Sequence, residues 1–249
     1  MPKTENFFIY GRKPVEEALS ARSKQIDKIF VKNSISSNSY KKIYETAFTN
    51  HIPLVTVPEA KILSLVGRVN HQGFVALMSN ITYSSFFDWI ETQDLTKRVA
   101  VLLLDGIEDP HNLGAILRTA AAAGVNAVMV PTQNQAPVNA TVFKTSAGTA
   151  GRIPIIRVHD TSQGFKDLKL AGFSIVGLDG LAENEIWEAE FENPIAFLIG
   201  NEGKGISKGL LKKCDQLIKF PMEHNVESLN ASVSAALVSY EWKRRGLII

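Results

Sequence analysis

The sequence contains a single cysteine, Cys214, among its 249 residues. One thiol cannot form an internal disulfide or a cysteine-rich zinc site, so Cys214 is expected to be a reduced thiol in the core. No apolar run reaches the roughly 18 residues that span a bilayer, and the first residues lack the apolar segment of a signal peptide. These absences predict a cytoplasmic protein with no membrane partner and, on this sequence, no required metal.

Net charge is also low, at +2, but it is unevenly distributed. Residues 1–80 contain 11 Lys and Arg against 6 Asp and Glu, whereas residues 98–249 contain 15 against 16. An excess of positive charge in the first part of the chain favours contact with a polyanion. A small solvated domain with no such partner is the alternative.

The apolar pattern divides the chain into two parts. Residues 1–80 alternate short apolar segments with short helical patterns, which predicts a small α/β domain. Residues 81–97 are polar with scattered aromatics and are expected to form a partly docked linker. From residue 98, longer strand and helix patterns alternate, including a helix over 112–123 and another near 138–144. Residues 98–249 therefore predict a parallel sheet covered by helices on both faces.

The segment from Phe220 to Gly246 is the most informative. Ser228 or Asn230 is a candidate N-cap, and the cationic end and Gly246 suit a helix stop. Apolar residues at helical spacing predict the packed stripe of this helix: Leu229, Val233, Leu237 and Tyr240. Residues 227–232 contain more hydroxyl and amide groups than one cap requires, which indicates a functional segment.

A second segment, from Asp105 to Thr119, follows a predicted strand. Asn112 is a reasonable helix cap. The buried stripe of that helix is expected to contain Leu113, Ile116, Leu117 and Ala120. Arg118 lies at the edge of the stripe, where an arginine is either solvated or functional.

A third segment, Gly200-Asn201-Glu202-Gly203-Lys204-Gly205, lies between a strand and a helix. Glycines allow backbone N–H groups to approach a ligand closely. The segment lacks the Lys-Ser/Thr ending of an ATP-binding loop and does not follow the first strand, as a dinucleotide fingerprint would. The acidic Glu202 disfavours phosphate and suits a cationic or neutral ligand.

Together the three segments resemble the signature motifs of the SpoU (TrmH) family, RNA ribose 2′-O-methyltransferases of the SPOUT class. The resemblance covers nearly the whole chain and is closest to the 23S ribosomal RNA guanosine 2′-O-methyltransferase (RlmB-like) members. It implies S-adenosyl-L-methionine as cofactor and a homodimer. It also implies that the C-terminal parallel-sheet domain contains a deep trefoil knot, preceded by a ribosomal-protein-like RNA-binding domain.

The same resemblance assigns roles to individual residues. The catalytic set that it implies is Arg118, Asn112, Glu202, Ser228 and Asn230. The cofactor-binding set that it implies is Gly200, Phe220, Met222, Leu229, Thr145, Ser146 and Gly148. The RNA face of the first domain is expected to include Arg12, Lys13, His71 and Gln72, although His71 is otherwise an ordinary surface histidine beside a turn. Two positions depart from the family pattern, His224 where glycine is usual and Ala231 where valine is usual.

The expected function is methylation of the ribose 2′-hydroxyl of a nucleotide, a guanosine, in large-subunit ribosomal RNA. Transfer RNA is the alternative substrate, and a non-catalytic RNA-binding ribosome-assembly factor is the alternative class. A Rossmann-type oxidoreductase is a third possibility, but its glycine fingerprint does not follow the first strand of either part.

Overall fold

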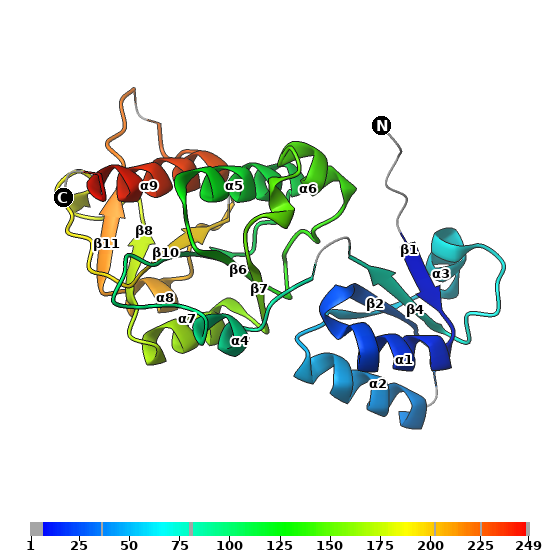
Figure 1. Ribbon diagram of the computed structural model, residues 1–249. Coiled ribbons are helices and arrows are strands. Elements are labelled where there is room, and N and C mark those ends of the chain that lie inside the picture. Colours follow the sequence, from blue (N-terminus) through cyan, green and yellow to red (C-terminus); the bar gives the residue numbers. More distant parts are fainter. Residues whose placement is uncertain (1–6, 36, 80–81, 202, 225, 248–249) are drawn as a thin grey trace. The chain divides into compact units, whose positions relative to one another are not determined.

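A computed structural model describes residues 7–35, 37–79, 82–201, 203–224 and 226–247. The described chain separates into two compact units. The first consists of the residues up to Tyr83 together with Pro137–Ala140, and the second consists of Ser84–Ala136 and the residues from Thr141 onward. Each unit has its own sheet (Figure 1).

The first unit is a mixed sheet in the order β1-β4-β2-β3. Only β2 and β3 pair in parallel. Helices α1 and α2 pack on one face, where Val15, Leu19 and Ile43 join a buried apolar cluster. The elements are β1 (Phe7–Tyr10), α1 (Arg12–Arg22), β2 (Ile26–Lys32), α2 (Ser37–Thr49), β3 (Leu54–Val57), α3 (Glu59–Val66) and β4 (Phe74–Met78).

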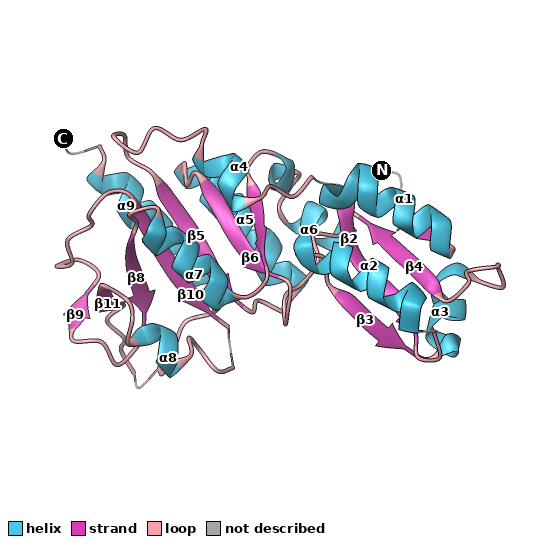
Figure 2. Ribbon diagram, turned by 90° about the horizontal axis from the view of Figure 1, so that it is seen from below, coloured by secondary structure: helices cyan, strands magenta, loops and turns pink. Residues whose placement is uncertain are grey.

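The second unit contains the predicted parallel sheet, in the order β7-β6-β5-β10-β8-β11-β9. Helices cover both faces, with α5 and α9 on one side and α4, α7 and α8 on the other (Figures 1 and 2). Its strands are β5 (Ala100–Asp105), β6 (Ala127–Pro131), β7 (Ile155–Val158), β8 (Ser174–Leu178), β9 (Asn184–Glu185), β10 (Ile195–Gly200) and β11 (Gln216–Lys219). Its helices are α4 (Phe86–Ile90), α5 (Pro110–Ala123), α6 (Ala140–Thr145), α7 (Thr161–Leu170), α8 (Lys208–Leu211) and α9 (Ala231–Arg245).

The segment predicted as a linker, residues 81–97, contains part of the core of the second unit. Ser85 caps α4 by accepting a hydrogen bond from the Asp88 N–H at 3.1 Å. Phe86 and Trp89 are each 5% exposed, and the Trp89 ring lies 6.4 Å from that of Phe173. The burial of these two aromatic side chains stabilises the packing of α4 on the second unit, although the residues around it are polar.

The start of α5 differs from the sequence prediction. Asp109, not Asn112, is the N-cap, and its Oδ1 accepts a hydrogen bond from the His111 N–H at 2.8 Å. Pro110 follows as the first helical residue, because its fixed φ and missing N–H suit that position. Asn112 therefore lies inside the first turn of α5. The predicted stripe of Leu113, Ile116, Leu117 and Ala120 is buried as expected.

Helix α9 buries a different stripe from the one predicted. Asn230 is its N-cap, one of the two candidates. The buried side, however, contains Ala231, Ala235, Val238 and Trp242, while Val233, Leu237 and Tyr240 are 44%, 38% and 50% exposed. Small residues allow α9 to approach α5 closely, so packing selected the stripe of alanines over the stripe of larger side chains.

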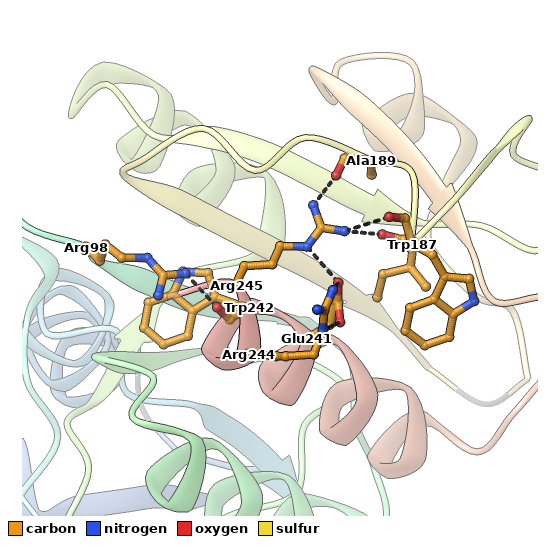
Figure 3. A network of polar contacts seen from close by, with 8 residues as sticks. Arg98, Trp187, Ala189, Glu241, Trp242, Arg244 and Arg245 are labelled. Atoms are coloured by element: carbon orange, nitrogen blue, oxygen red, sulfur yellow. Dashed lines mark hydrogen bonds and ion pairs between the residues drawn. The ribbon is translucent and has the colours of Figure 1, made fainter. Parts of the chain in front are cut away.

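A charged network fixes the last turns of α9 (Figure 3). The buried Glu241 accepts hydrogen bonds from Arg244 at 2.8 Å and from Arg245 at 2.7 Å. Arg245 also donates to the carbonyl oxygens of Ile186, Trp187 and Ala189. The end of the helix is thereby tied to the segment that follows β9.

Arg98, which lies just before β5, also contacts the end of α9. It donates a hydrogen bond of 2.6 Å to the Trp242 carbonyl oxygen and lies 4.6 Å over the Trp242 ring. Gly246 has an ordinary φ of −79°, so no left-handed conformation requires glycine there. A Cβ at this position would lie 1.2 Å from Arg98 Nη1, and the glycine is needed for that close approach.

Candidate functional site

The turn after β10 folds back tightly on the end of its own strand. Asn201 Oδ1 accepts hydrogen bonds from the N–H groups of Gly203 and Lys204 at 3.1 and 2.7 Å. A Cβ on Gly200 would lie 2.4 Å from the carbonyl carbon of Gly205, so only glycine fits at the strand end. The expected site residue Glu202 lies outside the described residues.

A cavity of about 220 Å³ opens beside this turn, at the carboxyl ends of β8, β10 and β11. In open parallel sheets, ligands bind outside this edge. Four predicted cofactor residues line the cavity: Gly200, Phe220, Met222 and Leu229. Ser228, predicted to be catalytic, lines it as well.

The loop after β8 contributes residues to the cavity that sequence reasoning missed. Leu178, Asp179 and Gly180 line it, and the Asp179 N–H donates to the Ile218 carbonyl oxygen at 3.0 Å. This contact follows from the strand order, in which β8 lies between β10 and β11. The sequence shows the Asp-Gly turn signal at 179–180 and the strands themselves, but not the order that places β10 and β11 on either side of β8.

Asn112 and Asn230, 118 residues apart in the sequence, are brought together next to the cavity. Asn230 Nδ2 donates to Asn112 Oδ1 at 3.1 Å. The Oδ1 atom of Asn230 accepts from the N–H and the hydroxyl of Ser232 at 2.8 and 2.6 Å, which fixes its orientation. The same Asn230 side chain also caps α9, so the position of the asparagine pair is fixed by the start of this helix.

Thr145, Ser146 and Gly148 do not line the cavity. Ser146 is fully buried and donates to the Phe143 carbonyl oxygen at 3.1 Å, while Gly148 has a left-handed φ of 80°. Thr145 Oγ1 lies 3.3 Å from Nδ1 of His111, a residue that sequence reasoning did not select. A Cβ on Gly114 would lie 2.7 Å from Thr145 Cβ, so this segment packs directly against the first turns of α5.

Arg118 lies apart from these residues on the exposed surface of α5. It does not line the cavity, and it makes no hydrogen bond or ion pair with any residue that the structure describes. Arg118 is six positions after Asn112, which places the two side chains on different sides of the helix. Within one chain the structure does not bring Arg118 to the asparagine pair.

In the first unit, three of the four predicted RNA-binding residues are exposed and close together. Arg12 and Lys13 begin α1, and the Arg12 N–H donates to Gln72 Oε1 at 3.0 Å. His71 differs from the expectation, because it is only 7% exposed and its Nδ1 accepts from the Gly73 N–H at 3.0 Å. His71 therefore holds the turn that presents Gln72.

No group of His, Cys, Asp and Glu suited to a metal ion occurs in the described parts of the chain. Among the same residues, none of the helices has the length and hydropathy that crossing a membrane requires.

Comparison with known proteins adds the family to this geometry. The model described as the SpoU rRNA Methylase family matches residues 99–240. The model described as RNA 2'-O ribose methyltransferase substrate binding matches residues 8–84. A relative from Staphylococcus epidermidis, named as a TrmH family tRNA/rRNA methyltransferase, is 37% identical over 242 residues, which are 97% of this chain and 96% of that protein.

Solved structures agree with this result. One, described as an RNA 2'-O ribose methyltransferase, is 28% identical with a TM-score of 0.57, over 97% of this chain and 89% of that chain. An AdoMet-bound rRNA methyltransferase from Sinorhizobium meliloti shares the fold, with a TM-score of 0.61 and 23% identity, over 97% of this chain and 88% of that chain. The chain therefore belongs to the SpoU rRNA methylase family of RNA methyltransferases.

Proposed function

We propose that the cavity beside Gly200 binds S-adenosyl-L-methionine and that the protein methylates a ribose 2′-hydroxyl of RNA. The observation that carries this proposal is the hydrogen bond between Asn112 and Asn230 at the edge of the cavity. It joins two motifs that are far apart in the sequence, and the third motif forms the cavity wall at Gly200.

The cavity lining suits this cofactor. Ile199, Phe220 and Leu229 offer apolar surface to an adenine ring. Asp179 and Glu227 also line the cavity, as do Lys204 and Lys219, and the two carboxylates would attract a sulfonium and an ammonium group. When bound, S-adenosyl-L-methionine supplies an electrophilic methyl group.

The transfer would form a bond between the methyl carbon and the ribose 2′ oxygen and break the sulfur–methyl bond, which would leave S-adenosyl-L-homocysteine, and the hydroxyl proton would pass to an RNA phosphate or to solvent. Arg118 is the proposed catalytic residue, with Asn112, Glu202, Ser228 and Asn230 positioning the groups around it. A guanidinium in a protein stays protonated and does not act as a base. Arg118 would then either orient the hydroxyl and stabilise the developing negative oxygen, or lie beside an RNA phosphate that accepts the proton.

The exposed position of Arg118 supports a homodimer as part of this proposal. Arg118 and the apolar stripe Val233, Leu237 and Tyr240 lie on α5 and α9, which pack together on one face of the sheet (Figure 1). A partner covering this stripe would also lie near Arg118. The deep trefoil knot at the C-terminal segment, typical of the SPOUT class, belongs to the proposal on the strength of family membership.

For the substrate we propose a guanosine in large-subunit ribosomal RNA, with transfer RNA as the second candidate. The excess of positive charge in residues 1–80 and the substrate-binding family model over residues 8–84 support an RNA-binding domain there. In this proposal residues 98–249 form the catalytic domain, and Arg12, Lys13 and Gln72 contact RNA.

The first experiment incubates the protein and labelled S-adenosyl-L-methionine with total RNA from a strain that lacks the gene. Label mapped to a ribose of large-subunit RNA supports both the reaction and the substrate, whereas label on transfer RNA selects the second candidate. If no label is transferred to any RNA and the protein binds no cofactor, the result would support the alternative of a non-catalytic assembly factor.

Replacing Arg118 tests its role directly. We expect Arg118→Ala to lower turnover by about 100-fold or more, as is usual when a group that stabilises transition-state charge is removed. Cofactor affinity should stay within about twofold, because Arg118 does not line the cavity. Lys166→Ala, at an exposed position of α7, is the matched control and should change neither property. Full methyl transfer by Arg118→Ala would remove Arg118 from the mechanism.

A further inference from the structure

An aromatic ladder on α2 lies outside the sites described above. Tyr40, Tyr44 and Phe48 follow one another at intervals of four residues, so they form one stripe along the helix. The rings of Tyr40 and Tyr44 stack with centroids 5.6 Å apart, and those of Tyr44 and Phe48 with centroids 6.1 Å apart. Tyr44 is 44% exposed and Phe48 is 52% exposed.

The ladder is not needed to attach α2 to its unit. Ile43 and Ala47, each 1% exposed, form the side of α2 that packs on the sheet. The aromatic stripe runs beside this buried side, and its first ring, Tyr40, packs partly against the core. Large aromatic rings held half in water are costly to solvate, which marks them as a contact surface.

The charges around the ladder favour a negatively charged partner. Lys41 and Lys42 lie on the same helix with side chains 76% and 69% exposed. Their ion pairs with Glu45 and Glu16 are long, at 4.0 and 3.6 Å, and such exposed pairs contribute little. Both ammonium groups can therefore turn to phosphates, in a unit with an excess of positive charge.

We propose that this ladder binds unpaired bases of the RNA substrate, with Lys41 and Lys42 contacting the backbone phosphates. Unpaired bases stack on aromatic side chains, and the tyrosine hydroxyls add hydrogen bonds to sugar and phosphate oxygens. The inference rests on the proposed function of the first unit, and it adds a second RNA-binding surface to the one formed by Arg12, Lys13 and Gln72. It also specifies single-stranded RNA as what this surface recognises.

The test measures binding of the full-length protein to a short labelled single-stranded oligouridine, at several salt concentrations. We expect the double variant Tyr44→Leu and Phe48→Leu to bind about tenfold more weakly, since stacking of each base contributes substantially. The slope of affinity against salt should not change, because no charge is removed. Lys41→Gln should instead reduce the steepness of that slope by about the amount expected for the loss of one phosphate contact.

Two controls separate the ladder from general effects. Phe87→Leu alters an aromatic ring that is 68% exposed on α4 in the second unit, and its RNA affinity should equal that of the wild type. Oligouridine containing 5-iodouridine, irradiated in the complex, should form crosslinks at Tyr40, Tyr44 or Phe48. Binding of S-adenosyl-L-methionine and thermal unfolding confirm that the variants remain folded.

Unchanged affinity of the double variant and no crosslink on α2 would overturn the inference, while transfer that depends on Arg118 would leave the proposed function intact. A changed oligomeric state in the double variant would make the ladder a contact between copies, and would overturn the inference equally. If the wild type neither binds nor methylates RNA, the proposed function fails as well.

Discussion

Gly200 carries no side chain, and the turn that follows it occupies the space where one would be. A Cβ there would lie 2.4 Å from Gly205 carbonyl carbon and 2.5 Å from the Ile206 nitrogen, both backbone atoms. A flexible side chain could move aside, but these atoms cannot move without reshaping the cavity wall.

We therefore expect Gly200→Ala to weaken binding of S-adenosyl-L-methionine by more than about tenfold and to destabilise the fold by about 1–3 kcal/mol, as overpacking does. Calorimetric titration and urea unfolding measure both effects. Gly209→Ala is the control, because nothing lies within 4 Å of a Cβ there and the position is helical. Equal cofactor affinity of Gly200→Ala and wild type would contradict the assignment of the cavity.

Cys214 illustrates a residue whose chemistry follows from its surroundings. Burial, with the neighbouring Asp215 carboxylate, raises the pKa of the Cys214 thiol to about 11. Its Sγ donates to the Leu210 carbonyl oxygen at 3.4 Å. At pH 8 only about one thiol in a thousand is then the reactive thiolate.

Iodoacetamide should accordingly modify the native protein far more slowly than the protein unfolded in urea. The mass of the adduct, followed with time in both conditions, measures the ratio. Similar rates in the two conditions would show that the thiol is neither shielded nor raised in pKa.

The family resemblance named five residues that line the cavity, Gly200, Phe220, Met222, Ser228 and Leu229, but not the contacts that arrange them. These five belong to motifs that can be recognised in the sequence, whereas the other lining residues do not stand out there. Asp179 and the contact of His111 with the predicted residue Thr145 were missed, because they depend on strand order and helix packing. His71 was assigned to the surface, because the sequence does not reveal that a glycine N–H occupies its ring nitrogen.

Helix α9 shows the same limit for a whole element. Two stripes have helical spacing in its sequence, one of large apolar residues and one of alanines with Val238 and Trp242. Periodicity identifies both, but only the facing helix α5 determines which one is buried. The helix itself, its cap at Asn230 and the parallel sheet beneath it were all predictable, because they depend on local pattern.

The cationic residues at the end of α9 interact with the Glu241 carboxylate as well as with the helix dipole. Hydrogen bonds from Arg244, and then from Arg245, lower the pKa of Glu241. A carboxyl group with a lowered pKa stabilises the fold above its unfolded pKa of about 4.3, and this stabilisation is lost as the pH falls through the folded value.

Glu241→Gln should thus reduce the free energy of unfolding by about 1–2 kcal/mol at pH 7, because Arg245 and the exposed Arg244 lose hydrogen bonds to a charged acceptor. The difference from wild type should shrink as the pH is lowered below about 4. Urea unfolding at both pH values measures this, with Glu190→Gln as an exposed control. A difference that stays constant with pH would exclude the ion pairs as its cause.

For the molecule as a whole, the decisive question is what covers the exposed stripe of α9. A stripe of this kind on a single chain is a candidate interface, and the proposed homodimer would bury it. The same association would place a second chain beside Arg118, which is exposed on α5.

Leu237→Glu should then convert the protein from dimer to monomer in sedimentation experiments and reduce methyl transfer, because a buried unpaired carboxylate is strongly unfavourable. Leu170→Glu alters a leucine that is 88% exposed on α7 and should change neither property. A wild-type monomer, or a Leu237→Glu dimer, would remove this stripe from the interface.

The contact between Arg98 and Trp242 has a consequence for how the protein is made. The two residues are 144 positions apart, and the arginine precedes the first strand of its sheet. During synthesis on the ribosome, Arg98 emerges long before the helix that holds it, so the second unit must wait, incompletely packed, until α9 has been translated. The first unit contains nearly all of its sequence by Tyr83 and can fold earlier. A message cut short before Trp242 would therefore yield a folded first unit joined to a second unit whose packing remains incomplete.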